Sequence, residues 1–258
     1  MAFEFHPDLL TPPDTTILWR YMDFARFVQL IETQTLWFAR ADQLEDPLEA
    51  TFTDAELEYF RSQRPPEGVL GRSTLENFTR QSKFMRATTY VNSWRAGEGE
   101  SLAMWDLYGK GSGIVAVKSS IGLLKNELAS FGGPAFVAQV RYMDWRAISF
   151  SNNVLVLCAR KDSSYEHESE VRAMIWEVAS PNQPIFREQF PNANPWGART
   201  VNDPPFGVSV SVNVGRMITE VIVGPRERPW VAELVRRLLS KYNLRSAIKV
   251  SDRLTARG

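Results

Sequence analysis

The sequence predicts a single α+β domain, built on a mixed central sheet with peripheral helices. Of the 258 residues, 44% are hydrophobic, which is enough to form one sizeable core. Runs of β-branched and aromatic residues alternate with segments of helical periodicity, without a regular βαβ repeat. No low-complexity tract or obvious linker divides the chain, so we expect residues 1–258 to form one domain.

The first elements are expected to be a strand, a helix and a second strand. β-Branched and aromatic residues favour a strand over residues 17–21, and Asp23 is suited to cap the helix after it. The apolar residues of that helix recur at helical spacing. A second strand is expected over residues 36–39, and Asp46 with Pro47 favours a turn beyond it.

The middle of the chain is expected to hold helices and three more strands. Residues 54–86 predict two charged helices interrupted by RPPEG, which we interpret as a helical insertion. A strand in ATTYVNSW is followed by a short helix, capped by Ser101 and ended by Gly109, in which we expect Trp105 to be buried. Strands in GIVAVKSS and AFVAQVRYMDW flank a helix in SIGLLKNELAS.

The last third of the chain is expected to complete the sheet. The run NVLVLCARK fits a helix or a strand equally well, whereas strands are predicted over residues 170–176 and 208–213 and in ITEVIVGP and SAIKVSD. An amphipathic helix is predicted from Pro229 to Tyr242. The residues of its apolar face, which should pack on the sheet, are Val231, Leu234, Val235, Leu238 and Leu239.

The charges are balanced overall but are unevenly distributed. Lys and Arg number 30, as do Asp and Glu, yet the residues from Arg226 onward include nine basic and three acidic ones. A basic end can attract nucleic acid, so a nucleic-acid-acting protein is one alternative. The other is that Arg236 and Arg237 form the solvated face of the predicted amphipathic helix.

Several kinds of chemistry lack the residues they need. With His6, His167 and Cys158 as the only histidines and cysteine, neither a standard zinc site nor an internal disulfide can form, so we expect no metal. The N-terminus lacks the basic and apolar pattern of a signal peptide, and no apolar run approaches the ~20 residues of a membrane span. We therefore expect a cytoplasmic protein without a membrane partner.

The stretch KDSSYEHESEVRAMIW carries the clearest candidate site. Glu168, Glu170 and Arg172 recur at every second position, which would place them on one face of a strand. They are either cross-strand ion pairs on a solvated sheet, each worth at most ~1 kcal/mol, or carboxylates held over a substrate. Arg20 is the only charge in its apolar strand and needs a partner, either a carboxylate such as Glu168 or a bound phosphate.

The segments LWRYMD, LWFARADQLEDPLEATF, SLAMWDLYGKGSGIVAVK, KDSSYEHESEVRAM and ITEVIVGP, with a following helix and VSDRL, together resemble the bacterial domain of unknown function (DUF) 2971 family. The resemblance spans nearly the whole chain. Where that family usually has Phe-Asn before Asp-Pro, this chain has Leu44 and Glu45. Its most specific residues are Asp46, Pro47, Glu49, Trp105, Tyr108, Lys161, Tyr165, Glu168, Glu170 and Arg172.

A weaker resemblance is to ADP-ribosyltransferases of the Arg-Ser-Glu type, carried by Arg20, Ser93 and Glu170 in that order. The usual Ser-Thr-Ser is here Asn92-Ser93-Trp94. This resemblance implies an ADP-ribosyltransferase-like fold, with NAD as cofactor and no metal. Glu170 would stabilise the ribosyl cation and Glu168 would activate an acceptor. The residues that would bind the cofactor are Arg20, Tyr21, Ser93, Trp105 and Tyr108.

The function implied by this second resemblance is NAD-dependent ADP-ribosyl transfer or NAD hydrolysis, in a toxin or phage-defence effector. The acceptor, protein or nucleic acid, is left open. A non-catalytic interaction module and a nucleic-acid-acting protein remain as alternatives, because a fold can be retained after its activity is lost.

Overall fold

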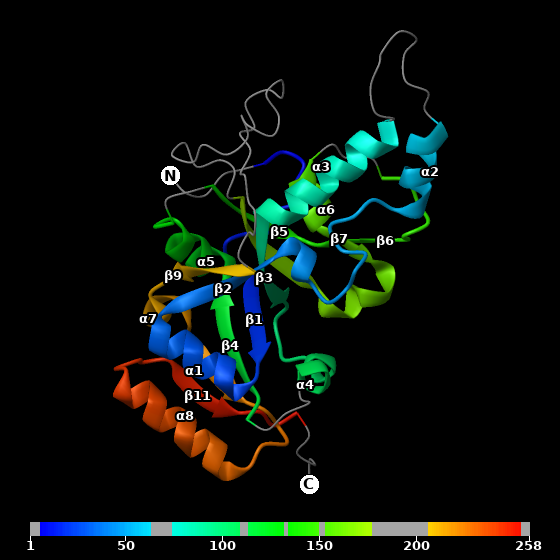
Figure 1. The fold of residues 1–258 in the computed structure, drawn as a ribbon. Coiled ribbons are helices and arrows are strands. Elements are labelled where there is room, and N and C mark those ends of the chain that lie inside the picture. Colours follow the sequence, from blue (N-terminus) through cyan, green and yellow to red (C-terminus); the bar gives the residue numbers. More distant parts are fainter. Residues whose placement is uncertain are drawn as a thin grey trace.

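The computed structural model describes residues 6–62, 74–108, 113–131, 134–149, 153–176 and 206–253. These residues form an α+β fold around a nine-stranded mixed sheet, with a second sheet of two strands (Figure 1). The strands are β1 (Ile17–Met22), β2 (Thr35–Arg40), β3 (Thr89–Ala96), β4 (Val115–Ser120), β5 (Ala135–Gln139), β6 (Arg141–Met143), β7 (Arg160–Asp162), β8 (Glu170–Trp176), β9 (Gly207–Ser211), β10 (Glu220–Val223) and β11 (Ala247–Val250).

Helices cover the sheet and fill its connections. The helical segments are α1 (Phe24–Thr33), η1 (Ala41–Gln43), α2 (Asp54–Ser62), α3 (Thr74–Thr88), α4 (Leu102–Tyr108), α5 (Ile121–Leu128), α6 (Val154–Cys158), η2 (Ser163–Glu168), α7 (Val214–Met217) and α8 (Pro229–Lys241). Among the residues that the structure describes, no helix is both long enough and apolar enough to cross a bilayer.

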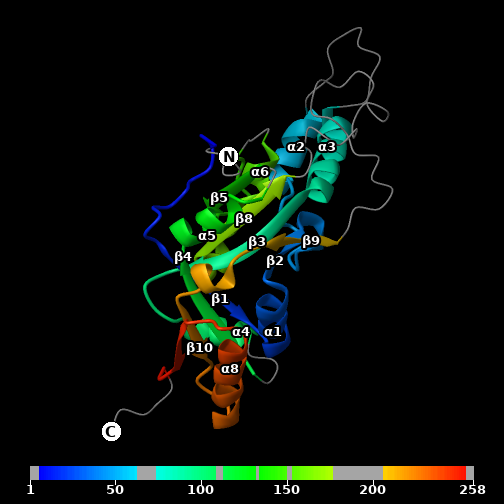
Figure 2. The same ribbon diagram turned by 90° about the vertical axis from the view of Figure 1, so that its left-hand side faces the viewer.

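The large sheet runs in the order β11-β10-β4-β1-β3-β2-β9, and β8 lies between β3 and β5. Figure 2 shows β3 and β8 side by side over most of their length, as their seven antiparallel residue pairs require. Only the β10–β11 pair of this sheet is parallel. Since β8 has a strand on each side, the backbone hydrogen-bonding groups along both of its edges are paired.

Strand β1 pairs with β3 over only part of its length, and this positions the site. It pairs with β4 from Ile17 to Met22, but with β3 only at Leu18 and Trp19. Beyond Trp19 the two strands separate, and the same edge of β3 pairs with β2 at Tyr90 and Val91. Arg20 is therefore the first residue of β1 past the point of separation.

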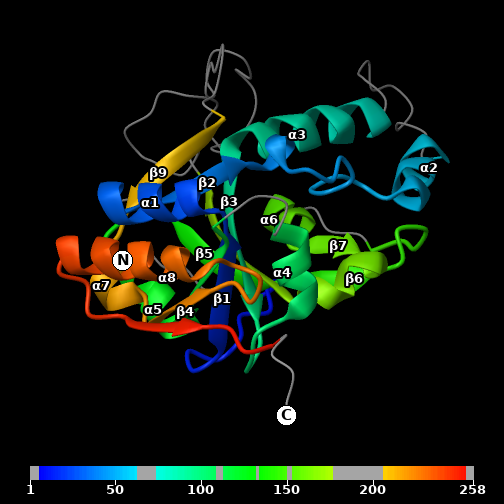
Figure 3. The same cartoon turned by 90° about the horizontal axis from the view of Figure 1, so that it is seen from below.

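The side chains of β1 alternate between two cores, as the period of a strand requires. Leu18 and Met22 belong to a large core that also receives the apolar faces of α1, α5, α7 and α8. Trp19 and Tyr21 join a smaller core beneath α4. Figure 3 shows these two groups of helices on opposite sides of β1.

Most predicted elements are confirmed. Strands over 17–21, 36–39 and 170–176 are present, Asp23 caps α1 by accepting from the Arg26 amide, and Trp105 is 3% exposed on α4. The strand predicted over 208–213 ends earlier, at Ser211, because the Asn213 side chain instead caps α7. Gly109, the expected end of α4, lies outside the described residues.

The ambiguous run NVLVLCARK contains both kinds of structure. Asn153 accepts a hydrogen bond from the Leu155 amide and starts α6, which ends at Cys158, and β7 begins at Arg160. The predicted helix from Pro229 is also present as α8. Its Val231, Val235 and Leu239 are buried, while Arg236 and Arg237 are exposed.

Candidate functional site

Arg20 extends from β1 toward β3 at the point where the two strands separate. Its Nη1 donates to the carbonyl oxygen of Ser93 at 3.0 Å, and its guanidinium lies 5.9 Å from the centre of the Trp94 ring. Within the described residues no carboxylate pairs with Arg20, so of the two alternatives for its partner the ion pair with Glu168 is not formed. Burial lowers the pKa of Arg20 to about 10, which leaves it charged at neutral pH.

The position of Arg20 leaves donors available for a ligand. A guanidinium has five N–H groups in a planar fork, and one contact to a neutral carbonyl does not compensate a charge. A phosphate oxygen satisfies both the charge and the geometry of such a fork. Arg20 is thus suited to bind an anion.

Helix α4 places aromatic rings beside Arg20. Tyr108 stacks with Tyr21, with ring centres 6.5 Å apart and an interplanar angle of 21°. The ring of Trp105 also packs edge-on against Tyr21, with ring centres 4.8 Å apart. The Tyr21 hydroxyl accepts from the Ser101 amide at 2.9 Å, which fixes the start of the helix. Trp105 is buried, whereas Tyr108 remains 37% exposed and can meet a ligand.

Glu170, at the start of β8, is held by a buried arginine two residues further along the strand. Arg172 donates from Nε to Oε1 of Glu170 at 2.8 Å and from Nη2 to Oε2 at 2.9 Å. Its Nη1 donates to the carbonyl oxygen of Cys158 at 2.7 Å. The Glu170 amide donates to the hydroxyl of Tyr142 at 2.7 Å, so both the backbone and the side chain of Glu170 are fixed.

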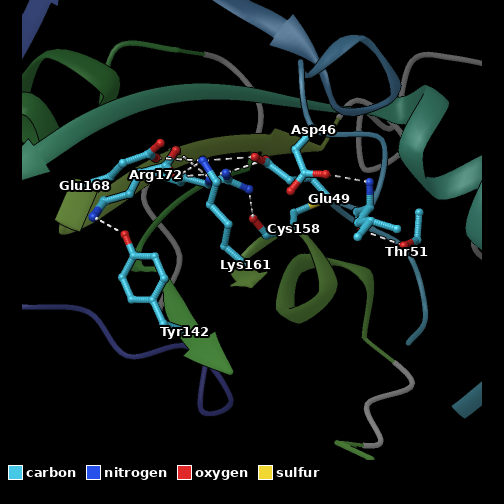
Figure 4. A network of polar contacts seen from close by, with 10 residues as sticks. Asp46, Glu49, Thr51, Tyr142, Cys158, Lys161, Glu168 and Arg172 are labelled. Atoms are coloured by element: carbon cyan, nitrogen blue, oxygen red, sulfur yellow. Dashed lines mark hydrogen bonds and ion pairs between the residues drawn. The ribbon is translucent and has the colours of Figure 1, made fainter. Parts of the chain in front are cut away.

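Lys161 joins Glu170 to two further carboxylates. Its Nζ lies 2.6 Å from Glu168, 3.1 Å from Glu49 and 3.5 Å from Glu170. Glu49 also contacts Arg172, which closes the network (Figure 4). We call Glu49, Lys161, Glu168, Glu170 and Arg172 the five-charge network.

The structure corrects two expectations about this network. The predicted strand face does not include Glu168, because η2 ends there and Ser169, with φ 46°, turns the chain into β8. Of the two alternatives for these charges, a solvated sheet face is wrong, since Glu170 is 5% and Arg172 1% exposed. The reason is that other segments cover this face of β8: Lys161 and Glu49 contact the two side chains, and the carbonyl of Cys158 accepts from Arg172.

The charges of the network do not cancel. Three carboxylates face two cations, which leaves one negative charge in excess. Burial raises the pKa of Glu168, and the hydrogen bond from Lys161 only partly opposes this. Burial also opposes ionisation of Glu170, but Arg172, Lys161 and a Ser93 hydrogen bond outweigh it and lower the pKa of Glu170. The site therefore holds one firmly ionised carboxylate beside one that protonates more readily.

Ser93 and Tyr108 connect the two halves of the site. The Ser93 carbonyl accepts from Arg20, and the Ser93 side chain is close enough to Glu170 to help lower the pKa of that carboxyl group. Burial raises the pKa of Tyr108, Arg20 opposes this, and Glu170 and Glu168 add to it. Tyr108 thus lies within electrostatic reach of both the free arginine and the two carboxylates.

Sequence reasoning assigned no role to Tyr142, Glu49 or Lys161. Glu49 and Lys161 are among the residues of the family resemblance, and a lysine following the apolar run of α6 was a signal that a buried carboxylate lies nearby. Tyr142 gives no such signal, because its contact with Glu170 joins residues 28 positions apart.

The described residues include no group of three or more His, Cys, Asp or Glu side chains arranged to hold a metal ion. A buried thiol is present at Cys158, whose pKa burial raises to about 12. Since a thiolate is the nucleophilic form, this cysteine is inert at neutral pH.

Comparisons with known proteins complete the description. No protein-family model and no curated protein matches the chain, so membership of the DUF2971 family stays a prediction. Among solved structures, "Thermus sp. 2.9 DarT in complex with NAD+" is similar, with TM-score 0.41, 11% identity and coverage of 93% of this chain and 98% of that one. "Thermus sp. 2.9 DarT in complex with ADP-ribosylated ssDNA" is similar with TM-score 0.40, 11% identity and coverage of 94% and 97%.

Proposed function

We propose that the protein is an NAD-dependent ADP-ribosyltransferase or NAD hydrolase. The observation that carries the proposal is that Arg20, Ser93 and Glu170 lie on three consecutive strands of the sheet, β1, β3 and β8, where Arg20 bonds the Ser93 carbonyl and Ser93 helps lower the pKa of Glu170. These residues belong to the motif that suggested the activity, and they meet although they lie far apart in the sequence. Ser93 accepts a hydrogen bond from Arg20 with its carbonyl, and its side chain favours the ionised form of Glu170.

The reaction assigns a task to each part of the site. Arg20 binds a phosphate of NAD, and Tyr108, supported by Tyr21, stacks on the nicotinamide. The bond between the ribose and the nicotinamide nitrogen breaks, the electron pair leaves with nicotinamide, and positive charge develops on the ribose. An ionised carboxylate beside that ribose stabilises the oxocarbenium-like state, as in glycoside cleavage.

Glu170 and Glu168 have different roles in the rest of the reaction. Arg172 and Lys161 keep Glu170 ionised, as stabilisation of a cation requires. Glu168 has a raised pKa, which suits a group that accepts the proton of the attacking water or acceptor hydroxyl. Buried Trp105 keeps α4 in place through its Nε1 contact with Glu100 at 3.0 Å and thereby supports Tyr108.

The test is nicotinamide release from NAD by the purified protein, first alone and then with protein and single-stranded DNA acceptors. Glu170→Gln keeps the size of the side chain and removes its charge, so we expect a loss of about a hundredfold to a thousandfold. Glu233→Gln, at an exposed ion pair of α8, is the matched control and should keep full activity. Absence of NAD turnover by the wild type with every acceptor would refute the proposal.

We also propose that this activity serves a toxin or phage-defence effector, since consumption of NAD harms the cell that performs it. Expression of the wild-type chain should slow bacterial growth, and Glu170→Gln should restore it. Equal growth with the wild type and the variant, at equal protein levels, would argue against this role.

A second candidate is a non-catalytic interaction module. The observation in its favour is that Arg172 already bonds both oxygens of Glu170, as in an ion network that serves only the fold. This candidate predicts no NAD binding by calorimetry. It also predicts that Glu170→Gln and Arg172→Met change only stability.

A further inference from the structure

Glu49 bridges the two cations that hold the proposed catalytic carboxylates. Its Oε1 lies 3.1 Å from Nζ of Lys161, and its Oε2 accepts from Nη2 of Arg172. Lys161 binds Glu168, and the same Nη2 of Arg172 binds Glu170. Glu49 is therefore one residue away from each of the two carboxylates.

The turn that carries Glu49 is fixed on both sides. On one side, Asp46 accepts from the Leu48 amide at 2.9 Å. On the other, the carbonyl of Thr51 accepts from Nη2 of Arg160 at 3.1 Å. Between them, fully buried Ala50 has φ 56°, a conformation that residues with a Cβ seldom adopt and that persists only where the surroundings impose it.

The charge of Glu49 sets the charge balance around Lys161 and Arg172. Without it, Glu168 and Glu170 would face Lys161 and Arg172 in a balanced set, and each carboxylate would be neutralised by its own partner. With it, the cations are shared among three carboxylates and a negative charge remains. Accordingly, Glu49 is among the groups that raise the pKa of Glu168.

We infer that Glu49 is a positioning residue of the active site, which orients Glu170 through Arg172 and keeps the pair of carboxylates electronegative toward the developing ribosyl cation. This inference rests on the proposed function. Glu49 acts through the two cations and has no direct task in the reaction. Its contribution therefore resembles that of outer residues that hold the ligands of a catalytic metal, whose loss typically costs 10- to 100-fold in activity.

The experiment measures kcat, KM and the pH dependence of nicotinamide release for wild type and Glu49→Gln. We expect kcat to fall about 10- to 100-fold while KM for NAD stays within about twofold, because Arg20 and Tyr108 are unchanged. The acidic limb of the pH profile should move to lower pH, since removal of the Glu49 charge lowers the pKa of Glu168. If the role of Glu49 were purely structural, its replacement would leave the acidic limb at the pH found for wild type.

The matched control is Glu56→Gln. It also takes a buried carboxylate from an arginine, Arg160, and should cost comparable stability, but Glu56 contacts no member of the five-charge network. We expect its acidic limb to match the wild type. Should Glu49→Gln not fold, Glu49→Asp keeps the charge but cannot reach both cations, and it should lower kcat without moving the limb.

The outcomes separate the inference from the proposal beneath it. A wild-type protein that releases no nicotinamide overturns both. A wild type that is active, with an unchanged kcat and acidic limb in Glu49→Gln, or with an unchanged kcat in Glu49→Asp, overturns the inference alone.

Discussion

Two neighbouring residues of β7 enter buried ion clusters of different character. Arg160 forms a closed pair with Glu56, with Nη1 2.8 Å from Oε1 and Nη2 3.1 Å from Oε2. Its guanidinium also donates to the carbonyls of Ser149 and Thr51, and lies 6.0 Å from the centre of the Trp145 ring. The next residue, Lys161, points to the five-charge network, since adjacent side chains of a strand point to opposite faces.

The difference lies in charge balance and in what borders each cluster. The Arg160–Glu56 pair is neutral, and both side chains are fully buried. The five-charge network is one cation short and lies near exposed Tyr108. A neutral enclosed pair joins α2 to β7 and has no means of meeting a ligand. An unbalanced network beside an exposed ring is where we expect chemistry.

The largest expected effect breaks the closed pair. Arg160→Met leaves Glu56 buried without its partner, and we expect the free energy of unfolding to fall by about 3–5 kcal/mol in a denaturant titration. The acidic limb of the pH profile of nicotinamide release should be unchanged, because every charge of the five-charge network remains. The double variant Arg160→Met/Glu56→Leu should regain much of the stability, and a double variant as unstable as the single one would contradict this account.

The next effect concerns NAD binding. Arg20→Gln removes a charged hydrogen-bond donor worth about 1.5–3 kcal/mol, so the Kd for NAD should rise about 10- to 150-fold in calorimetry. Arg26→Gln is the matched control, because Arg26 is exposed and pairs only with Asp23 at 3.5 Å. Equal weakening of NAD binding by both variants would show that Arg20 acts only through the long-range electrostatic field of the protein and does not bond the ligand.

A third prediction uses the opposite pKa shifts of the two carboxylates. The lowered pKa of Glu170 means that its stabilising effect is complete above the unfolded value, near 4.5, and is lost as the pH falls through the folded value. The raised pKa of Glu168 has the opposite sign, so stability is lost as the pH rises from about 4.5 through the folded value.

The free energy of unfolding of wild type, Glu170→Gln and Glu168→Gln, measured from pH 3 to 7, gives the contribution of each carboxylate to stability. The stability difference between wild type and Glu170→Gln should shrink toward low pH, and the advantage of wild type over Glu168→Gln should grow there. Parallel curves for the three proteins would contradict the proposed split between the carboxylates.

The smallest effect is expected on α8. Arg236 and Arg237 lie 3.4 and 3.1 Å from Glu233, and exposed pairs of this kind contribute at most about 0.5 kcal/mol. Replacing both by Gln should leave thermal unfolding and electrophoretic mobility with DNA unchanged. A large loss of DNA binding, with a steep dependence on salt, would instead favour the nucleic-acid-acting alternative.

The sequence was sufficient for elements whose pattern is local. Asp23 and Ser101 mark helix starts through their own side chains, and the apolar spacing of α8 shows its buried face directly. Asn213 shows the limit of this approach, because alternation alone extends β9 through a residue that caps the next helix.

The candidate site was only partly predictable, because its contacts depend on strand order. Alternation suggested that Glu168 and Glu170 share a strand face, whereas Lys161 brings them together from another strand. The segments that cover Arg172, which carry Glu49 and Cys158, are distant from β8 in the sequence, so the burial of Arg172 cannot be read from the residues of β8 alone. Glu49 reaches Arg172 across 123 positions of sequence.

The order of the sheet also governs when the chain can fold during synthesis. One edge of β2 pairs with β3, some 50 positions later, but the other edge pairs with β9 at residues 207–211. Until those residues leave the ribosome, the backbone of Thr35–Arg40 keeps a row of unpaired hydrogen-bonding groups along a strand that contains Trp37. Such late, distant pairing slows folding and exposes a nascent chain to aggregation, so in cells this protein is expected to depend on chaperones that bind extended apolar segments.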